Sequence, residues 1–399
     1  MSKEIAHFQN FAKLKDTKVE FNDITVLAGK PSTGKSYVMK FMYAVKERSY
    51  QNNLTPLIAV LGAIGLDNLI DNLIQDESLR KNLKYLSKSE QYNELEKLIK
   101  DYFTNQNSSQ ATISNLDFFL TAIQNKRISK STQNKNEYYL DNIIKSIFGS
   151  HKQISNEYKV TYNDEELSYE NEKLNIKKEN SNIIKLGRLE PIFVETPLIL
   201  EFKKFMNREK GKTPYHIESL LNILDTDYSF TDEEQDKFIQ EFTQKSKAII
   251  NGNVESSGDS FVFKTDSKDY DILNASSGIK SIGLLQYLVT NKALKKGSIL
   301  FWEEPEVHLH PKWQLKMVDL FVELMNAGVK IVFSTHSPYM ADYLNAISQK
   351  GEFRDRVSFN LLQESDGVVE NRILEDNEDW NQIQAELLDP LEEIMWEYI

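Results

Sequence analysis

The chain of 399 residues contains no cysteine, which excludes disulfide bonds, thiolate metal sites and a cysteine nucleophile. A reducing compartment is the natural place for such a chain, so we expect a cytoplasmic protein. Long hydrophobic runs are missing too. No stretch approaches the roughly 18 uninterrupted apolar residues of a membrane span, and the segment from Met1 has no apolar run of signal-peptide type. We therefore expect no membrane partner.

Positive net charge is also absent, because 48 lysines and arginines face 60 aspartates and glutamates, for a formal net charge of −12. A phosphate backbone is attracted by positive potential, so this balance disfavours indiscriminate coating of nucleic acid, although it allows a local basic groove. Two basic clusters are candidate DNA contacts. The alternative is that they are ordinary solvated surface. The first cluster contains Lys126, Arg127, Lys130 and Lys135, and the second contains Lys203, Lys204, Arg208, Lys210 and Lys212.

One short segment matches the phosphate-binding pattern G-x-x-x-x-G-K-[ST]. It lies between an apolar run at 24–27, which predicts a buried strand, and residues 37–45, which predict a helix. The backbone N–H groups of such a loop bind phosphates, with Lys35 reaching the β- and γ-phosphates and Ser36 holding Mg²⁺. A glycine-containing turn without a ligand is the alternative. The predicted ATP contacts are Gly29, Lys30, Pro31, Ser32, Thr33, Gly34, Lys35, Ser36 and Tyr37.

Two acids follow a second apolar segment, Ile299–Trp302, which predicts another strand. The chain turns at the end of a strand, so the neighbouring carboxylates of Glu303 and Glu304 can address one magnesium–phosphate centre. In this interpretation Glu303 holds Mg²⁺ through a bound water, and Glu304 orients and partly deprotonates the attacking water. The alternative is a pair of solvated acids at a strand terminus.

A histidine occupies the same position after the next strand. A helix predicted at Lys312–Asn326 separates a strand at Gly297–Trp302 from one at Lys330–Phe333, which makes a βαβ unit and predicts a parallel sheet. His336 follows the second strand, where it can donate a hydrogen bond to the γ-phosphate and report its presence. A purely structural histidine is the alternative.

A turn of small residues, Ser276, Ser277 and Gly278, opens a later helix. An exposed helix N-terminus of this kind is a second anion-binding device. One nucleotide should not need two such devices, so the second would bind the phosphate held by another copy of the chain. This predicts a head-to-tail homodimer with symmetric sites. A plain serine N-cap is the alternative.

Hydrophobic periodicity divides the rest of the chain into alternating and helical segments. Residues 4–30 alternate as an antiparallel hairpin would, whereas 55–148 and 198–250 show helical spacing. Strand character returns at Tyr158–Tyr162, Pro191–Val194, Phe261–Phe263 and Ile272–Leu273, and polar composition predicts loops at 105–115 and 129–136.

The two halves of the predicted nucleotide site lie far apart in the sequence, which sets the expected domain division. We expect a head assembled from both ends of the chain, 1–50 and 255–350, around inserted material. A helical insertion would occupy 51–150 and a lobe of strands and helices 151–254. A C-terminal strand and helix at 351–399 would close the head.

These pieces, in this order, resemble the ATPase heads of the ATP-binding-cassette (ABC) superfamily. The similar branch contains the RecF, chromosome-maintenance (SMC) and OLD proteins, together with bacterial and archaeal AAA family ATPases of defence and abortive-infection systems. The runs Glu303–Gln314 and Thr335–Tyr339 carry most of this resemblance. It implies an α/β P-loop NTPase fold, with an ABC-ATPase-like mixed sheet, helices on both sides and a large helical insertion.

Carried onto this chain, the resemblance implies ATP and Mg²⁺ as ligands and a switch function. ATP would close the dimer, hydrolysis would reopen it, and the inserted lobes would transmit the change to DNA or to a partner effector, in DNA repair or anti-phage defence. The implied functional residues are a Walker A loop at Gly29–Ser36, Walker B acids at Glu303 and Glu304, a trans-acting signature around Ser276 and Gly278, and a switch histidine at His336.

The chain departs from the family pattern at several positions. Glu303 stands where an aspartate is commoner, Ser277 replaces the first glycine of the signature, and Leu309-His310 falls where cassette transporters usually have Leu-Asp. No glutamine can be assigned to the glutamine loop, for which Gln124 and Gln153 are only guesses.

Two other functions stay open. One is a non-catalytic nucleotide-sensing scaffold, and the other is the ATPase subunit of a transporter, which the Glu-Pro-Glu-x-His-Leu-His run and the helical insertion disfavour. Beyond His336, acids such as Asp376 and Glu378 are scattered rather than clustered as in a metal nuclease, so any cutting would require an effector from another chain. His308 and His310 are a candidate metal pair for which the sequence offers no third ligand.

Overall fold

The computed structural model describes residues 3–51, 133–178, 190–203, 213–226, 233–351, 353, 355–373, 380 and 387. The helices expected between 55 and 132, the loop at 105–115, Gln124, Asp376, Glu378 and most of the two basic clusters lie outside the described residues. Within the described ranges, no helix is both long and apolar enough to cross a membrane.

An 11-stranded mixed sheet forms the centre of the fold, with the strand order β6-β5-β4-β1-β2-β14-β13-β3-β12-β11-β7. A separate three-stranded sheet has the order β10-β9-β8. In chain order the strands are β1 (Glu4–Phe11), β2 (Leu14–Phe21), β3 (Ile24–Ala28), β4 (Tyr158–Tyr162), β5 (Glu165–Glu170), β6 (Lys173–Lys178), β7 (Ile192–Val194), β8 (Asn253–Ser257), β9 (Ser260–Lys264), β10 (Asp269–Asp271), β11 (Ile299–Trp302), β12 (Lys330–Thr335), β13 (Val357–Ser365) and β14 (Val368–Ile373).

The large sheet has a parallel and an antiparallel part. Strands β13, β3, β12, β11 and β7 pair in parallel, whereas β6, β5, β4, β1 and β2 pair antiparallel. Parallel strands are covered on both faces and therefore need continuous apolar sequence; β3 is buried at every position. Because β3, β11, β12 and β7 run the same way, the residues that follow them meet at one edge of the sheet.

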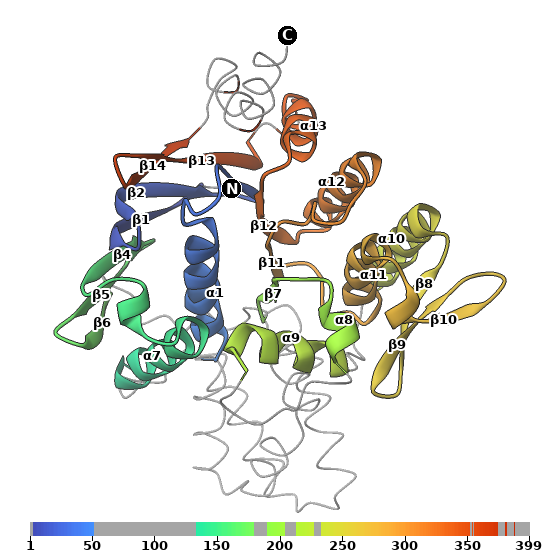
Figure 1. The fold of residues 1–399 in the computed structure, drawn as a ribbon, viewed down its shortest axis with the longest axis horizontal. Helices are drawn as coiled ribbons and strands as arrows, with labels where there is room; N and C mark the ends of the chain where they lie inside the picture. The colour runs from blue at the N-terminus through green and yellow to red at the C-terminus, as the bar shows by residue number, and fades with distance from the viewer. Residues whose placement is uncertain are drawn as a thin grey trace, which may run out of the picture.

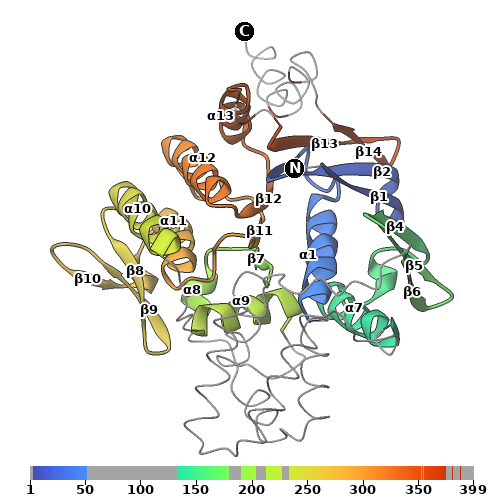
Figure 2. The same ribbon diagram turned by 180° about the vertical axis from the view of Figure 1, so that it is seen from behind.

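Helices cover both sides of the parallel strands. Figures 1 and 2 show α1 on one side of β7, β11 and β12, with α11 and α12 on the other. The described helices are α1 (Lys35–Gln51), α7 (Gln133–Phe148), α8 (Ile199–Phe202), α9 (Tyr215–Asp225), α10 (Glu233–Ile250), α11 (Ser277–Thr290), α12 (Pro311–Asn326) and α13 (Pro338–Ser348), with 3₁₀ turns at His151–Gln153 and Ile272–Asn274.

Two apolar clusters fill the two sides of the sheet. Successive strand residues point to opposite faces, so Phe301 of β11 joins the cluster that contains α1 and the antiparallel strands, while its neighbour Trp302 joins the cluster beneath α9 to α13. In the first cluster the rings of Phe11 and Phe41 lie 4.9 Å apart. In the second, the rings of Trp302 and Phe321 lie 6.2 Å apart. The parallel strands are thus anchored from both faces.

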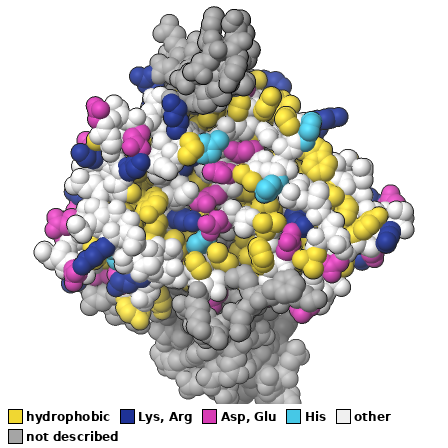
Figure 3. All heavy atoms as spheres, viewed as in Figure 1, with side chains coloured by type: hydrophobic (Ala, Val, Ile, Leu, Met, Phe, Trp, Pro, Cys, Tyr) yellow, Lys and Arg dark blue, Asp and Glu magenta, His cyan; other side chains and the backbone are white. Residues whose placement is uncertain are grey.

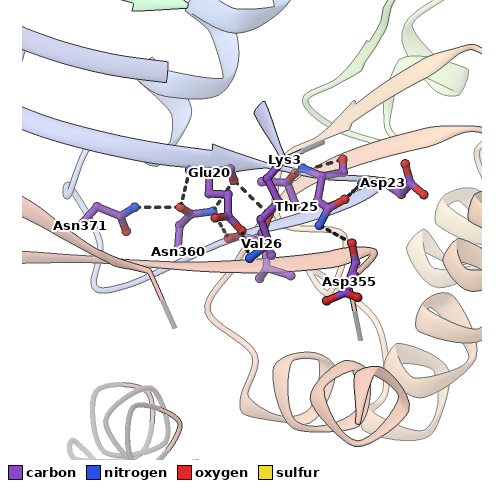
Figure 4. A network of polar contacts seen from close by, with 10 residues as sticks. Lys3, Glu20, Asp23, Thr25, Val26, Asp355, Asn360 and Asn371 are labelled. Atoms are coloured by element: carbon purple, nitrogen blue, oxygen red, sulfur yellow. Dashed lines mark hydrogen bonds and ion pairs between the residues drawn. The ribbon is translucent and has the colours of Figure 1, made fainter. Parts of the chain in front are cut away.

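A buried asparagine ties the N-terminal hairpin to the parallel strands (Figure 4). The Asn360 side chain of β13 accepts the N–H of Glu20 at 2.9 Å and donates to the Glu20 carbonyl at 2.9 Å. Asn371 of β14 donates to the Asn360 Oδ1 atom at 2.8 Å, and Lys3 pairs with the Glu20 carboxylate at 3.1 Å. A buried amide is costly unless it is hydrogen-bonded, so these contacts favour one placement of β2 relative to β13.

Most of the strand and helix predictions that fall on described residues are confirmed. Residues 4–30 form the hairpin of β1 and β2 followed by β3. The predicted βαβ unit is β11, α12 and β12, with β11 and β12 pairing in parallel. The mixed α/β fold with helices on both sides of the sheet is therefore as the sequence predicts.

Two local predictions are wrong. Residues 133–136 belong to α7 and not to a loop at 129–136, because the buried side chains of Leu140 and Ile144 give this segment an apolar face despite its polar start. Ile272 and Leu273 lie in a 3₁₀ turn and not in a strand. The Asp271 carboxylate accepts the N–H of Leu273 at 2.9 Å, which turns the chain at this point.

The expected division into a head, an insertion and a lobe stays a prediction. Strand β4, from the expected lobe at 151–254, pairs with β1 of the expected head, so both belong to one sheet.

Candidate functional site

The segment predicted to bind phosphate connects β3 directly to α1. Gly29 and Gly34 have φ angles of +134° and +91°, a region that residues with side chains rarely adopt. A Cβ atom on Gly29 would lie 2.2 Å from the carbonyl oxygen of Leu362 in β13, so a side chain does not fit there. The Val38 N–H donates to the Gly34 carbonyl at 3.0 Å, so the helix starts immediately at the loop. This is a tight turn into a helix N-terminus, the arrangement that binds anions.

The ammonium group of Lys35 folds back onto the loop. It donates to the carbonyl oxygens of Gly29 and Lys30, both at 2.8 Å. Burial lowers the pKa of Lys35 to about 8, while the carboxylates of Glu304 and Glu306 act in the opposite direction. The structure therefore brings a lysine from the start of the chain into electrostatic contact with acids that follow it by more than 250 positions in the sequence.

Ser36 and Glu303 meet as a hydroxyl–carboxylate pair. The Ser36 hydroxyl lies near enough to Glu303 to act against the rise of its pKa, and the Glu303 Oε1 atom is buried without a hydrogen-bond partner. Burial raises the pKa of Glu303 to about 7. Mg²⁺ prefers oxygen ligands, including carboxylates and coordinated water, so a magnesium ion here would satisfy the orphaned oxygen. The residues present therefore fit Mg²⁺.

Glu304 and His336 meet from the ends of β11 and β12. The Glu304 Oε1 and His336 Nε2 atoms lie 3.3 Å apart, and the Glu304 N–H donates to Ser334 Oγ at 3.2 Å. Glu304 has a φ of +44°, uncommon for a residue with a side chain and a local strain that the surrounding contacts maintain. Burial lowers the pKa of His336, and the nearby Lys35 charge adds to this effect, so the imidazole is neutral at neutral pH.

A third glutamate of the same loop, Glu306, turns back toward the end of β12. Its Oε1 atom accepts the N–H of His336 at 2.6 Å, and its Oε2 atom is buried without a hydrogen-bond partner. Burial raises the pKa of this carboxyl. The sequence motif contains Glu306, but residue patterns alone gave it no role. Its position in the turn just after the predicted strand was the only feature of the sequence that could have pointed to a role for Glu306.

The neighbouring strand β7 ends in a different carboxylate, Glu195. Its Oε2 atom lies 2.7 Å from the buried His216 Nε2 atom, and its Oε1 atom accepts from Lys40 Nζ at 3.0 Å. The hydrogen bond from His216, with help from Lys40, lowers the pKa of Glu195 to about 2. Glu195 also raises the pKa of Glu303, so its charge acts on that carboxyl. The sequence predicted the strand at Pro191–Val194 but pointed to no role for Glu195, Lys40 or His216.

The small-residue turn at the start of α11 forms its helix cap. Ser276 Oγ accepts the N–H of Ile279 at 3.4 Å, which is the plain N-cap role that the sequence allowed. A Cβ atom on Gly278 would lie 3.2 Å from the Trp313 ring, so little space is left at that position. Helix α11, which includes Ser277, lies across the parallel strands from α1 in Figures 1 and 2. Binding of a second copy's phosphate by this turn stays a prediction.

Other predicted contacts lie around the phosphate loop. Lys30, Pro31 and Ser32 are exposed at the tip of the loop, and Thr33 is buried. The Tyr37 ring packs against Phe148, with centroids 5.3 Å apart, and its hydroxyl donates to the carbonyl of Gln153 at 3.4 Å. This places Gln153 beside the first turn of α1. The sequence left the glutamine loop unassigned. In the structure the strand next to β11 is β7, and the residue after it is Glu195 and not a glutamine.

Two further candidates have structural contacts. His310 Nδ1 accepts the N–H of Lys312 at 3.2 Å and caps α12. No group of three or more His, Cys, Asp or Glu side chains suited to a metal ion, with or without His308, is present within the described ranges. Lys203 was a candidate DNA contact, but it is buried and pairs with Asp225 at 2.8 Å, so that interpretation is wrong for Lys203.

The site lies at the middle of one face of the molecule. Figure 3 shows acidic and histidine side chains gathered there, over the central strands of Figure 1. The sequence matches the family model of the AAA ATPase domain over residues 6–341. The chain belongs to the AAA ATPase domain family. Both halves of the site lie within the matched range, so this membership confirms the resemblance to an ABC-type P-loop head.

Solved structures of SMC heads are similar to this family member over nearly its whole length. An SMC head bound to the C-winged helix domain of ScpA has 12% identity and a TM-score of 0.46, covering 96% of this chain and 100% of that chain. The SMC head domain from Thermotoga maritima has 9% identity and a TM-score of 0.42, covering 94% and 100%. The Pyrococcus furiosus SMC head with an extended coiled coil, bound to the C-terminal domain of ScpA, has 11% identity and a TM-score of 0.37, covering 96% and 99%. No curated protein sequence matches significantly.

Proposed function

We propose that this AAA ATPase domain protein binds Mg·ATP between the phosphate loop and the acids after β11, and hydrolyses it. The observation that carries the proposal is that the Glu304 carboxylate acts electrostatically on the Lys35 ammonium group and that its Oε1 atom lies 3.3 Å from His336 Nε2. Lys35 and Glu304 come from opposite ends of the chain, and a cation and a carboxylate at one centre are what phosphoryl transfer to water requires. The orphaned oxygen of Glu303 beside Ser36 supports the same assignment.

Each residue has a defined task in this proposal. Lys35 would exchange its two carbonyl contacts for the β- and γ-phosphate oxygens, and a phosphate nearby would raise its pKa again. Ser36 and Glu303 would hold Mg²⁺, which when bound supplies positive charge at the phosphate oxygens. Glu304 would orient the attacking water and accept its proton. The neutral His336 has a single N–H, which in the ligand-free chain faces the Glu304 carboxylate and would turn to the γ-phosphate when ATP binds.

We further propose that ATP closes a head-to-tail homodimer and that hydrolysis reopens it. In support, α11 and α1 lie on opposite sides of β7, β11 and β12, so a nucleotide at α1 would meet Ser276, Ser277 and Gly278 of a second copy rather than its own. Dimer closure would act on DNA or on a partner effector, in DNA repair or anti-phage defence.

Steady-state hydrolysis tests the enzymatic part. We expect Mg-dependent turnover by the parent, and a loss of about 10²- to 10⁴-fold in Glu304→Gln, because the general base is removed. ATP binding should survive in Glu304→Gln and weaken in Lys35→Ala by about 10-fold or more. A parent that binds ATP without turnover would favour the nucleotide-sensing scaffold. Normal ATP affinity in Lys35→Ala would count against the phosphate loop.

Mixing two inactive variants tests the dimer. Lys35→Ala disables the phosphate loop and Ser277→Glu places a negative charge where the second copy's phosphate would bind. In a mixed head-to-tail dimer, one site combines the intact loop of one chain with the intact turn of the other. We therefore expect mixing to restore hydrolysis that neither variant shows alone. Failure to restore it, with both variants folded, would contradict the trans arrangement.

A further inference from the structure

The loops that follow β11 and β12 are joined through backbone groups as well as through the Glu304–His336 side chains. The Glu304 N–H donates to Ser334 Oγ at 3.2 Å, so β12 holds the first loop. In return, the Glu306 carboxylate of the first loop accepts the N–H of His336 at 2.6 Å. The loop after β11 and the end of β12 with its following residue therefore each supply a side-chain acceptor to a backbone N–H of the other segment.

A short turn aims Glu306 at this position. The Val307 N–H donates to the Glu304 carbonyl at 3.0 Å, and the Leu309 N–H donates to the Glu306 carbonyl at 2.8 Å. This tight path carries the chain around Pro305 and sends the Glu306 side chain back toward the end of β12. Strand β12 ends at Thr335, so the N–H of His336 lies beyond the strand and is satisfied by this carboxylate.

We propose that Glu306 is a positioning residue for ATP hydrolysis, which holds the backbone at His336 so that the imidazole stays against Glu304. The inference rests on the proposed ATPase function. Its physical basis is that the His336 side chain has few ways to reach Glu304 once its own N–H is tied to the loop that carries Glu304. Small displacements of a catalytic group are costly, because a shift of about 1 Å can lower a rate by about 100-fold.

The contact needs an acceptor oxygen and not a negative charge. Burial raises the pKa of Glu306, and a protonated carboxyl still accepts a hydrogen bond through its carbonyl oxygen. Glutamine presents an oxygen at the same distance from the backbone, whereas alanine leaves the N–H of His336 without its acceptor. The substitutions Glu306→Gln and Glu306→Ala therefore separate positioning from charge.

Kinetics of the full-length chain give the first test, with Glu137→Ala as the matched control. Glu137 of α7 also accepts a backbone N–H, that of Ile176 at 3.1 Å, but it lies outside the site. We expect kcat to fall about 10- to 100-fold in Glu306→Ala with little change in ATP affinity, to recover in Glu306→Gln, and to stay at the parental value in Glu137→Ala. Unchanged kcat in Glu306→Ala overturns the proposal, as does equal impairment in Glu306→Gln.

Hydrogen exchange gives a second test that does not depend on turnover. The amide of His336 should exchange faster in ligand-free Glu306→Ala than in the parent, and at the parental rate in Glu306→Gln, measured on the peptide that spans the end of β12. If the parent lacks ATPase activity, the proposed function fails while this exchange result still decides whether Glu306 holds the loop. Equal exchange in all three proteins overturns the positioning role.

Discussion

Strands β7 and β11 lie side by side in parallel, and each ends in a glutamate, yet the two carboxyl groups have opposite electrostatic properties. At the end of β7, His216 and Lys40 both donate to Glu195, and its pKa falls to about 2. At the end of β11, Glu303 has one buried oxygen without a partner, and burial raises its pKa to about 7. One carboxylate is already satisfied by the protein. The other has a buried oxygen that no group among the described residues satisfies.

The difference shows that glutamates after adjacent strands of one sheet can have different tasks. One can be held by protein side chains while the other is left able to bind a cation. A carboxylate whose acceptors are occupied gains little from a further ligand, whereas a desolvated and unsatisfied one gains from any cation that replaces its proton. In our proposal Glu303 helps to hold Mg²⁺. Glu195 stays ionised next to it, because His216 and Lys40 stabilise its negative charge. Three measurements can test whether Glu303 and Glu195 differ in this way.

The largest expected effect concerns turnover. Glu303→Gln should lower Mg-dependent ATP hydrolysis by about 100-fold, because the amide offers no charge to the metal, and Glu195→Gln by only about 10-fold, because it acts on the site from outside. The measurement is kcat as a function of Mg²⁺ concentration. Equal losses in the two variants would mean that both carboxylates hold the metal directly, and the contrast would be lost.

The second effect concerns stability against pH in the ligand-free protein. The pKa of Glu303 is raised in the folded state from 4.5 to about 7, so folding is penalised as pH rises above 4.5, and the penalty is complete above about pH 7. Glu303→Gln removes this penalty. It should therefore raise the free energy of unfolding by about 1 to 3 kcal/mol at about pH 8, with no gain at about pH 4.5.

Glu195 provides the control for that measurement because the sign is reversed. Its folded pKa is lowered from 4.5 to about 2, so its stabilisation is present above pH 4.5 and is lost as pH falls toward 2. The side chain is 37% exposed, so solvent screening leaves about 1 kcal/mol. Glu195→Gln, made in the Glu303→Gln background so that the titration of Glu303 near pH 7 does not contribute, should cost this amount equally at about pH 6 and pH 8, by urea unfolding. A cost that changes over that interval would contradict the lowered pKa.

The smallest effect on stability is expected from Lys40, whose charge acts on both Glu195 and Glu303. Lys40→Met removes a 3.0 Å ion pair from Glu195 and a charge that lowers the pKa of Glu303. It should lower the free energy of unfolding at neutral pH by about 0.5 to 1 kcal/mol. Lys152 forms a matched but exposed pair with Glu172, so Lys152→Met should change the melting temperature very little. Equal effects of the two substitutions would contradict a stabilising role of Lys40 at Glu195 and Glu303.

The sequence was informative where a local pattern has one physical meaning. The glycines and lysine at 29–36 predicted a tight phosphate-binding turn, and the structure shows positive φ angles at Gly29 and Gly34 and a helix directly after them. The apolar run at 24–27 predicted a buried strand, and the runs at 297–302 and 330–333 predicted a parallel pair. In the structure β3, β12 and β11 are adjacent parallel strands. Acids and a histidine at strand ends could then be assigned to one edge of the sheet.

Reasoning from the sequence failed where partners are distant in the chain or where a local contact competes with the pattern. His216 belongs to α9 and shows no motif, so nothing in the sequence links it to Glu195. Lys203 looks like a surface cation in a basic cluster, but Asp225 and the Phe261 ring surround it. The Asp271 side chain turned an alternating segment into a 3₁₀ turn.

Sequence spacing was enough to locate the glycine-rich loop at 29–36, the strands that lead into the acids and the histidine, and membership of a P-loop ATPase family, because each depends on a few neighbouring residues. Which carboxylates are satisfied and which are not became visible only in the folded chain. Hydrogen bonding and desolvation depend on groups that arrive from other strands and helices, and no local pattern records whether His216 reaches Glu195 or whether an oxygen of Glu303 is left without a donor.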